Sequence, residues 1–388
     1  MVLIVFCALL ARYLDRVPAR HYCDFRVYYK AGQDFLAGKN IYFRESQEIT
    51  PFKYSPFFAF VFAPLSLVSI KISAAVFFAV NFLSTLIFFR LSYYFARGYP
   101  LAASFLDRQR FWAYALVALC SVRYVFLVWD SGQVTILMCA LVLAALSFMR
   151  KDKDLWAGFF FAAAILIKYT PFLFLPYLLF QRKFKLVCWS IFFIILFLVL
   201  PALGVGWEKN IFYLSSWLPS IISTSLDQYS YLYSKNQSIY SLFIRFFSWS
   251  QYHVNVTAFD FNQALMLGRL AAFLLYAMVF MPGPAKPKEW GIDIAMLLIC
   301  MALFNPNGWM VNFVSLIFPF MLLVQYLIVV KGRDWFVLFL LIAGVFLINI
   351  MSKDFTGKTS ENLGCAYSFT TFGALCIYVA LLKLKFLK

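Results

Sequence analysis

The chain has 388 residues, of which 64% are hydrophobic and only 13% are charged. An average soluble domain has roughly 25% charged residues, so this composition excludes a soluble protein built around a single core. The 48 Phe and 23 Tyr residues also exclude disordered, collagen-like and coiled-coil chains. The net charge of +17 would suggest nucleic acid binding in a soluble protein, but in this composition it indicates membrane topology and anionic lipids.

Apolar runs occur along the whole sequence, and we interpret residues 1–388 as a single transmembrane domain. Each transmembrane helix needs about 20 apolar residues, so the composition allows up to about a dozen spans. The runs lie near residues 1–14, 57–89, 111–128, 133–149, 155–167, 169–181, 186–204, 264–281, 291–304, 310–330, 335–351 and 366–382. The sequence therefore predicts an all-α polytopic membrane protein with about twelve transmembrane helices.

Two of these runs are interrupted. The run at 57–89 is long, and Pro56, Pro64 and Lys71 predict a re-entrant or interfacial piece before a helix that begins near residue 72. The runs at 155–167 and 169–181 meet at Lys168, and Pro171 disfavours helix in the residue before it. Breaks at membrane depth usually line a cavity or are buried in protein.

The distribution of basic residues predicts the orientation. The loops at 90–110, 150–154, 182–185, 282–290 and 331–334 and the tail after 382 carry 17 Lys and Arg residues, whereas the short loops at 129–132, 168–171, 305–309 and 352–365 carry 3. By the positive-inside rule the first set is cytoplasmic. Both termini are then cytoplasmic, and two long segments, 15–56 and 205–263, form extracytoplasmic loops.

The first of these loops contains a candidate catalytic carboxylate. Asp24 precedes a stretch in which Phe25, Tyr28, Tyr29 and Phe35 share one helical face, which predicts an amphipathic helix on the membrane surface. The alternative interpretation of Asp24 is an ion pair with Arg20 or Arg26.

Further polar residues lie on the same predicted side of the membrane. They are Lys53, Gln133, Lys168, Asn236, Gln237, Arg245, Trp309 and Asn312. Taken singly, each also fits a turn, a helix cap or an interfacial aromatic. Lys168 is the least easily explained in that way, because a Lys between two apolar runs either extends to the interface or meets an anion in a polar cavity.

The sequence lacks the common cofactor motifs. It has no GxGxxG, P-loop or HExxH pattern and only two distant histidines, which argues against dinucleotide, ATP and zinc sites. The Asp152-Lys153-Asp154 pattern has the spacing of a metal-binding DxD motif, but we interpret it as a solvated turn. We expect neither a cofactor nor a metal.

The order of these motifs resembles glycosyltransferase family 87 over about residues 24–320. The matching motifs are Asp24-Phe25-x-Val27-Tyr28-Tyr29, Lys53-Tyr54-Ser55-Pro56-Phe57-Phe58-Ala59, Ala63-Pro64-Leu65, Gly132-Gln133, Ile167-Lys168-x-x-Pro171, Asn236-Gln237-Ser238 with Arg245, and the Asn305–Trp309 turn. In one respect the chain departs from the family. Many members have one or two His after this turn, whereas Met310-Val311-Asn312 follows Trp309 here. We expect Asn312 to replace the His as a hydrogen-bond partner only.

The resemblance implies a GT-C-like helix bundle that moves a hexose, mannose-like, from a polyprenyl-phosphate donor to a glycolipid or glycan acceptor. It implies that Asp24 is the general base of an inverting transfer. The residues implied to bind the donor phosphate or the substrate are Tyr28, Tyr29, Lys53, Gln133, Lys168, Asn236, Gln237, Arg245, Trp309 and Asn312. The expected location is the bacterial inner (plasma) membrane with the active site extracytoplasmic, with membrane lipids but no nucleic acid as partners.

Two other functions remain open from the residues alone. A polymerase or ligase of lipid-linked oligosaccharides would also be polytopic with a large outer loop. A lipid or sugar transporter would show internal repeats and polar residues near the midplane of several spans. No clear repeat is present, and the span interiors offer mainly Asn81, Arg123 and Asn349.

Overall fold

The computed structural model of the protein describes residues 2–16, 23–42, 51–97, 108–226, 228–248, 259–281, 290–330 and 333–386. Within these ranges the regular elements are helices, and the β-structure is one isolated bridge between Ser248 and Phe259. The chain forms two compact units, residues 1–88 with 125–223 and residues 89–124 with 224–388. We describe them separately as unit 1 and unit 2.

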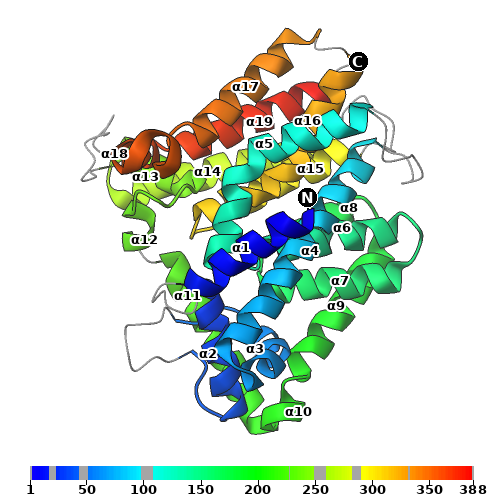
Figure 1. Ribbon diagram of the computed structural model, residues 1–388, viewed down its shortest axis with the longest axis vertical. Helices are drawn as coiled ribbons and strands as arrows, with labels where there is room; N and C mark the ends of the chain where they lie inside the picture. Colours follow the sequence, from blue (N-terminus) through cyan, green and yellow to red (C-terminus); the bar gives the residue numbers. More distant parts are fainter. Residues whose placement is uncertain are drawn as a thin grey trace. The chain divides into compact units, whose positions relative to one another are not determined.

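Unit 1 contains the first half of the sequence apart from the region around residues 89–124. Its elements are α1 (Val2–Arg16), α2 (Asp24–Leu36), α3 (Pro56–Phe62), η1 (Ala63–Leu67), the first part of α4 (Ile70–Arg97), the last part of α5 (Arg108–Ser131), α6 (Thr135–Met149), α7 (Asp154–Ile167), η2 (Thr170–Leu173), α8 (Phe174–Phe180), α9 (Phe184–Val199), α10 (Ala202–Val205) and α11 (Trp207–Leu226), whose end belongs to unit 2. Helix α7 packs between α6 and α9, and α2 packs against α3 and η1 (Figure 1).

Unit 2 contains the remaining helices. Besides its parts of α4, α5 and α11 these are α12 (Gln228–Leu232), α13 (Ile239–Phe247), α14 (Phe261–Phe280), α15 (Trp290–Leu303), η3 (Met310–Leu316), α16 (Ile317–Val329), α17 (Trp335–Asn349), α18 (Lys353–Ala366) and α19 (Phe369–Phe386). Helix α15 forms the centre of the unit, because it packs against α14, α16, η3 and α19 and eleven of its residues are buried. Helix α19 packs against α17 on another side.

Twelve apolar helical segments are present in the described residues, but only six have the length of a membrane span. The six are 70–96, 108–131, 184–205, 261–280, 310–329 and 369–386. The segments 56–67, 135–149, 154–167, 170–180, 290–303 and 335–349 are apolar but only 10–17 residues long. The prediction of an all-helical membrane protein is confirmed. The predicted number of about twelve transmembrane helices is not confirmed, because six of the described helices are long enough to span a membrane.

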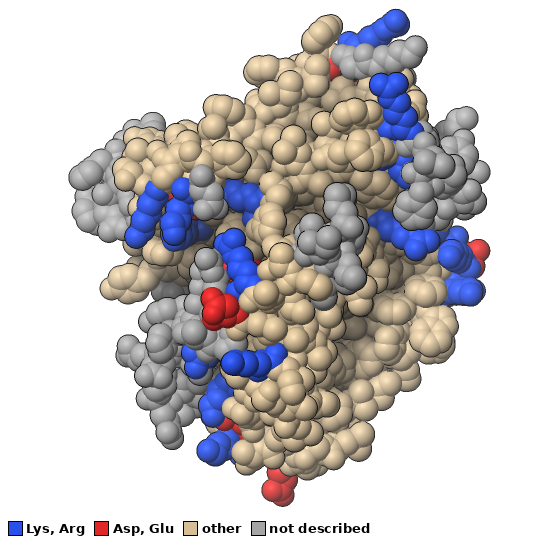
Figure 2. Space-filling view, in the orientation of Figure 1, with Lys and Arg blue, Asp and Glu red and all other residues tan. Residues whose placement is uncertain are grey.

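The surface agrees with this assignment. Figure 2 shows wide areas without acidic or basic side chains, as expected for surfaces that contact lipid tails. Large apolar side chains on candidate spans are exposed, for example Leu203, Leu119 and Val329. Exposed apolar surface of this extent is unusual in a soluble monomer and marks a membrane or partner surface.

The two predicted interruptions are present. The run at 57–89 divides into α3 with η1, which end at Leu67, and α4, which begins at Ile70. Helix α7 ends at Ile167, and the η2 turn begins at Thr170. The predicted amphipathic helix of the first loop is α2, which begins at Asp24. Residues 17–22 and 43–50 of this loop, and residues 227 and 249–258 of the second long loop, lie outside the described residues.

An internal ion pair accounts for Arg123, the basic residue that the sequence places inside the predicted span at 111–128. Arg123 lies in unit 2, where its Nη2 is 3.1 Å from Glu361 Oε1 of α18 and its Nη1 donates to the carbonyl of Ile348 at 2.7 Å. Asn349 donates to the carbonyl of Cys120 at 3.1 Å. Both side chains thus join α5 to the end of α17 rather than lining a path through the unit.

Candidate active site

The start of α2 presents the candidate base. Cys23 is in an extended conformation, the helix runs from Asp24 to Leu36, and Gly38 follows it with a φ of +62°. Helical spacing places Tyr28 one turn after Asp24. The buried face of the helix, which includes Phe25 and Tyr28, packs into an aromatic cluster with side chains of α3 and α4. The carboxylate is therefore attached to a rigid, largely aromatic support.

The loop between α5 and α6 is fastened onto the start of α2. Gly132 has a φ of +65°, and a Cβ at this position would lie 2.7 Å from the Cβ of Phe25, so the close approach requires glycine. The thiol of Cys23 donates to the carbonyl of Ser131 at 3.1 Å. These contacts bring Gln133, 109 positions later in the sequence, close to Asp24, where its side-chain amide lowers the pKa of the carboxyl group.

Two tyrosines surround Gln133. The hydroxyl of Tyr28 donates to Gln133 Oε1 at 3.4 Å and lies 2.9 Å from the hydroxyl of Tyr54. Tyr54 comes just before α3, where the side chain of Ser55 caps the helix by accepting from Phe58 N–H and Pro56 occupies the first helical position. The Lys53–Ala59 motif therefore sets the start of α3 and the position of Tyr54.

Lys168 completes this cluster. It follows α7 in an extended conformation, and its Nζ donates to the hydroxyl of Thr135, the first residue of α6, at 3.2 Å. Burial lowers the pKa of Lys168 to about 8, and the charge of Asp24 acts in the opposite direction. The ammonium group therefore still carries a positive charge over most of its population at neutral pH.

The carboxyl group of Asp24 is only partly stabilised as an anion. Burial raises its pKa above the ordinary value, while a hydrogen bond from Gln133 and the charge of Lys168 lower it. A raised pKa makes a carboxylate a stronger base, which suits removal of a proton from a hydroxyl group. This arrangement of base, amide and cation can deprotonate an alcohol and hold an anionic leaving group.

The other two predicted residues of unit 1 are Tyr29 and Lys53. Tyr29 donates its hydroxyl to the carbonyl of Val68 at 2.8 Å, and its own carbonyl accepts from Ser66 Oγ at 2.9 Å. Tyr29 thus holds α2 against η1. Lys53 is exposed.

In unit 2, Asn236 joins two of the predicted motifs. Its Nδ2 donates to the carbonyls of Ser230 and Pro306, at 2.9 Å and 2.6 Å. Its Oδ1 accepts from the backbone N–H groups of Ser238 and Gly308, at 3.0 Å and 3.1 Å. All hydrogen-bonding positions of this fully buried amide are occupied by the chain itself.

The guanidinium of Arg245 is also used internally. The side chain is fully buried, its Nη1 donates to the carbonyl of Asn236 at 2.8 Å, and its Nε and Nη2 donate to Ser368 Oγ at 3.2 Å and 2.5 Å. These contacts tie α13 to the residue before α19. They engage all three nitrogen atoms of the guanidinium within the protein.

The other three predicted residues of unit 2 belong to the same assembly. Gln237 donates its side-chain amide to the carbonyls of Ser234 and Cys365, at 2.8 Å and 2.9 Å. Asn312 donates to the carbonyl of Asn307 at 2.9 Å. Trp309 is the accessible one, with 40% of its surface exposed, and its ring packs edge-on against Tyr233.

Two residues of the cluster around Asp24 are absent from the sequence-based prediction. Tyr54 lies inside a motif that the sequence does single out, so its place beside Lys53 is a usable signal. Thr135 has no comparable signal, because a Thr at the start of an apolar run is the ordinary sign of a helix beginning.

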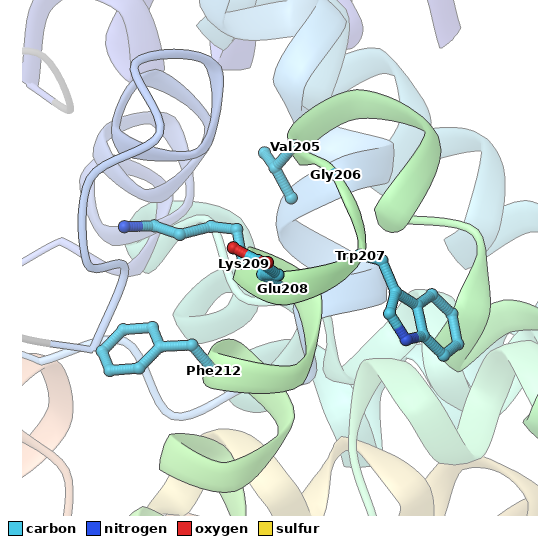
Figure 3. A pocket seen from close by; sticks show the side chains of 6 residues that line it. All are labelled: Val205, Gly206, Trp207, Glu208, Lys209 and Phe212. Carbon is cyan, nitrogen blue, oxygen red and sulfur yellow. The ribbon is translucent and has the colours of Figure 1, made fainter.

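A surface pocket lies elsewhere in unit 1. It is lined by residues of α10 and α11 and the turn between them, namely Val205, Gly206, Trp207, Glu208, Lys209 and Phe212. Figure 3 shows Trp207 pointing away from Lys209 and Phe212. None of the predicted site residues lines this pocket.

Comparison with known proteins identifies the family. No curated protein and no solved structure shows significant similarity to the chain. The model of glycosyltransferase family 87 matches residues 52–306, which include Gln133 and Lys168 but not Asp24. This match covers well over half of the chain, and together with the apolar helices it identifies the protein as a membrane glycosyltransferase of family 87.

Proposed function

We propose that the protein transfers a hexose, mannose-like, from a polyprenyl-phosphate donor to a glycolipid or glycan acceptor at the extracytoplasmic face of a bacterial inner membrane. The observation that carries this proposal is the grouping of Asp24, Gln133 and Lys168 in unit 1. A base beside an amide and a cation suits a reaction in which a hydroxyl loses its proton and a phosphate leaves.

A lipid-linked donor fits the chain for a second reason. The polyprenyl tail is held by the bilayer, so the protein needs no nucleotide-binding domain and must recognise only the phosphate and the sugar. Lys168 supplies a cation and Gln133 an amide donor for the phosphate, and a charge-assisted hydrogen bond contributes about 1.5–3 kcal/mol.

In the proposed transfer, Asp24 removes the proton from the acceptor hydroxyl. The hydroxyl oxygen attacks the anomeric carbon, the bond from this carbon to the phosphate oxygen breaks, and its electron pair stays on the phosphate. A single displacement of this kind inverts the anomeric centre. Tyr28 and Tyr54, whose hydroxyls lie 2.9 Å apart beside Gln133, orient the amide.

We assign the polar residues of unit 2 a different role. The amide of Asn236 is fully hydrogen-bonded, and all three nitrogen atoms of the Arg245 guanidinium donate to other residues of the protein, so we propose that they hold the turn at residues 305–309 in place. Trp309 is then the residue of this turn that offers an exposed face to substrate.

The test uses purified Asp24→Asn with a polyprenyl-phosphate hexose and a glycolipid acceptor. This substitution keeps the size of the side chain but removes the proton acceptor, so turnover should fall by about 100 to 10,000-fold with unchanged thermal stability. The matched control is Asp34→Asn, because Asp34 lies on the same helix but pairs with Lys30 at 2.9 Å. Turnover by Asp24→Asn at more than a tenth of the wild-type rate would remove Asp24 from the chemistry.

A further inference from the structure

Tyr54 is the accessible member of the pair of tyrosines beside Gln133. Its hydroxyl lies 2.9 Å from that of Tyr28, and the hydroxyl of Tyr28 donates to Gln133 Oε1 at 3.4 Å. Tyr28 and its bond to Gln133 are fully buried, whereas Tyr54 is partly exposed. A substrate can therefore reach the hydroxyl of Tyr54 but not that of Tyr28.

The number of protons in this pair sets the direction of its hydrogen bonds. A phenol has one O–H donor, and its oxygen also has lone pairs that accept. The proton of Tyr28 is used in the bond to Gln133 Oε1, so the oxygen of Tyr28 accepts in the bond to Tyr54. Tyr54 is then the donor of that bond. Its exposed oxygen has no second proton to give and can only accept a hydrogen bond from a ligand.

The amide of Gln133 is consistent with this direction. Because Oε1 is bonded to Tyr28, the NH₂ group is the part of the amide that remains for other acceptors. The amide lowers the pKa of Asp24, as expected when an N–H group and not a carbonyl oxygen faces a carboxyl group. The opposite orientation would turn Oε1 toward the carboxylate, where both groups accept. The three side chains thus form an ordered series that runs from Tyr54 through Tyr28 to Gln133.

The ring of Tyr54 is held in place by its neighbours. It meets the ring of Tyr28 edge-on with the centroids 5.0 Å apart, and the centroids of Phe52 and Phe58 lie 5.5 Å and 5.4 Å away. The backbone carbonyl of Tyr54 accepts from the hydroxyl of Tyr42 at 3.0 Å. The accepting oxygen is therefore fixed before a ligand binds, which reduces the entropy lost on binding.

We propose that the hydroxyl oxygen of Tyr54 accepts a hydrogen bond from a sugar hydroxyl of the substrate and so contributes to the choice of sugar. An oxygen that can only accept binds O–H groups and disfavours phosphate oxygens, which accept as well. The phosphate is then directed to the donors of Gln133 and Lys168, and the sugar to Tyr54. This inference rests on the proposed function and adds the residue that recognises the sugar.

The transferred hexose and the acceptor sugar both carry hydroxyl groups, so the test uses an analogue of each. The donor analogue is a farnesyl phosphonate in which a CH₂ group replaces the glycosidic oxygen of the mannosyl phosphate, so that it cannot be cleaved. The acceptor analogue is octyl α-mannoside. In each series one sugar hydroxyl at a time is replaced by hydrogen or by fluorine. Fluorine can still accept weakly but cannot donate, so it separates the two directions of the hydrogen bond.

Isothermal titration calorimetry of the purified protein gives the Kd of each ligand. At one position of one series, hydrogen and fluorine should both weaken binding to the wild type by about 3 to 10-fold, as expected for the loss of one neutral hydrogen bond. In Tyr54→Phe, which keeps the ring and its packing, the same replacements should change the Kd by less than about 1.5-fold, because the accepting oxygen is absent. The series in which this position occurs identifies the sugar.

Two further variants test the direction and the specificity. Tyr28→Phe removes the group that takes the proton of Tyr54, so this proton becomes available to the ligand. Fluorine should then bind more tightly than hydrogen at the same position. Tyr213→Phe is the matched control, because its hydroxyl donates to the carbonyl of Lys39 at 2.6 Å elsewhere in unit 1, and it should keep the wild-type pattern.

The outcomes distinguish this inference from the proposed function. Equal losses in the wild type and Tyr54→Phe at every position, or a fluorinated ligand that binds the wild type as tightly as the hydroxyl compound, overturn the role of Tyr54, and tight binding of the donor analogue would still leave the proposed function standing. A Tyr54-dependent position in the acceptor series without binding of the donor analogue supports the inference and counts against the proposed donor alone. A wild-type protein that binds neither series overturns both.

Discussion

The carbonyl of Gly308 accepts the backbone N–H of Gln237 at 2.8 Å, and the N–H of Gly308 donates to Asn236 Oδ1 at 3.1 Å. These two bonds join motifs that are about 70 residues apart in the sequence. Together the two motifs form a hydrogen-bonded turn that carries the exposed Trp309. The motif residues of unit 2 therefore act mainly on the chain itself.

This contact predicts the effect of Gly308→Ala. A Cβ at this position would lie 2.4 Å from the backbone nitrogen of Ser238 and 2.8 Å from Asn236 Oδ1, so the two motifs must separate. Overpacking of this kind costs about 1–3 kcal/mol. Thermal unfolding in detergent should show a clear decrease in Tm. The control is Gly291→Ala, whose Cβ would meet Leu322 at an ordinary 3.5 Å, and an equal decrease in both variants would contradict the assignment.

Arg245→Met tests whether the buried guanidinium is structural. Methionine leaves the carbonyl of Asn236 and the hydroxyl of Ser368 without their donor, and we expect a loss of about 3–5 kcal/mol in unfolding free energy. The exposed Arg269→Met should change it by less than about 0.5 kcal/mol. Unfolding by denaturant in mixed micelles measures both. A stable Arg245→Met protein with strongly weakened donor binding would instead support a phosphate-binding Arg245.

The ion pair between Arg123 and Glu361 predicts energetic coupling between α5 and α18. In a double-mutant cycle with Arg123→Met and Glu361→Gln, the coupling should be about 1–3 kcal/mol because both side chains are largely buried. Arg123→Met should cost more than Glu361→Gln, since it also loses the bond to Ile348. In a control cycle, Lys358→Met replaces Arg123→Met and is combined with Glu361→Gln. Because Lys358 is exposed, its coupling to Glu361 should be less than about 0.5 kcal/mol. A coupling near zero for Arg123 would contradict the pair.

The raised pKa of Asp24 predicts the acidic limb of the pH profile. The base works only when deprotonated, so transfer should fall as the pH decreases through this pKa, which burial places above the ordinary value of about 3.9. The measurement is kcat/KM for the acceptor between pH 3.5 and 8. Activity that stays constant down to pH 4 would show that no group with a raised pKa acts as the base.

The charge distribution predicts the topology. Reporters fused to either terminus should be cytoplasmic, and a reporter within residues 205–263 should be extracytoplasmic, because basic residues in short loops are retained inside. Paired fluorescent-protein and alkaline-phosphatase fusions measure this. A cytoplasmic reporter in 205–263 would overturn the orientation and the proposed side of the active site.

The sequence alone was sufficient for those features that depend on local patterns. Composition predicted a helical membrane protein, proline and lysine positions predicted the interruption before α4 and the one at Lys168, and helical periodicity predicted the amphipathic helix that follows Asp24. Each of these is determined by residues within a few positions of one another, because helix periodicity and helix-breaking residues act locally.

Only the tertiary structure decided which polar residues meet one another. The sequence does not indicate that Gln133 lies close to Asp24, that Lys168 contacts Thr135, or that the donors of Asn236 and Arg245 are used by backbone carbonyls and Ser368. An Asn or Arg available to a substrate and one that satisfies buried carbonyls have the same local sequence signature. The difference arises from partners 9 to more than 100 residues away, and only the packing of the helices brings these partners within hydrogen-bond distance.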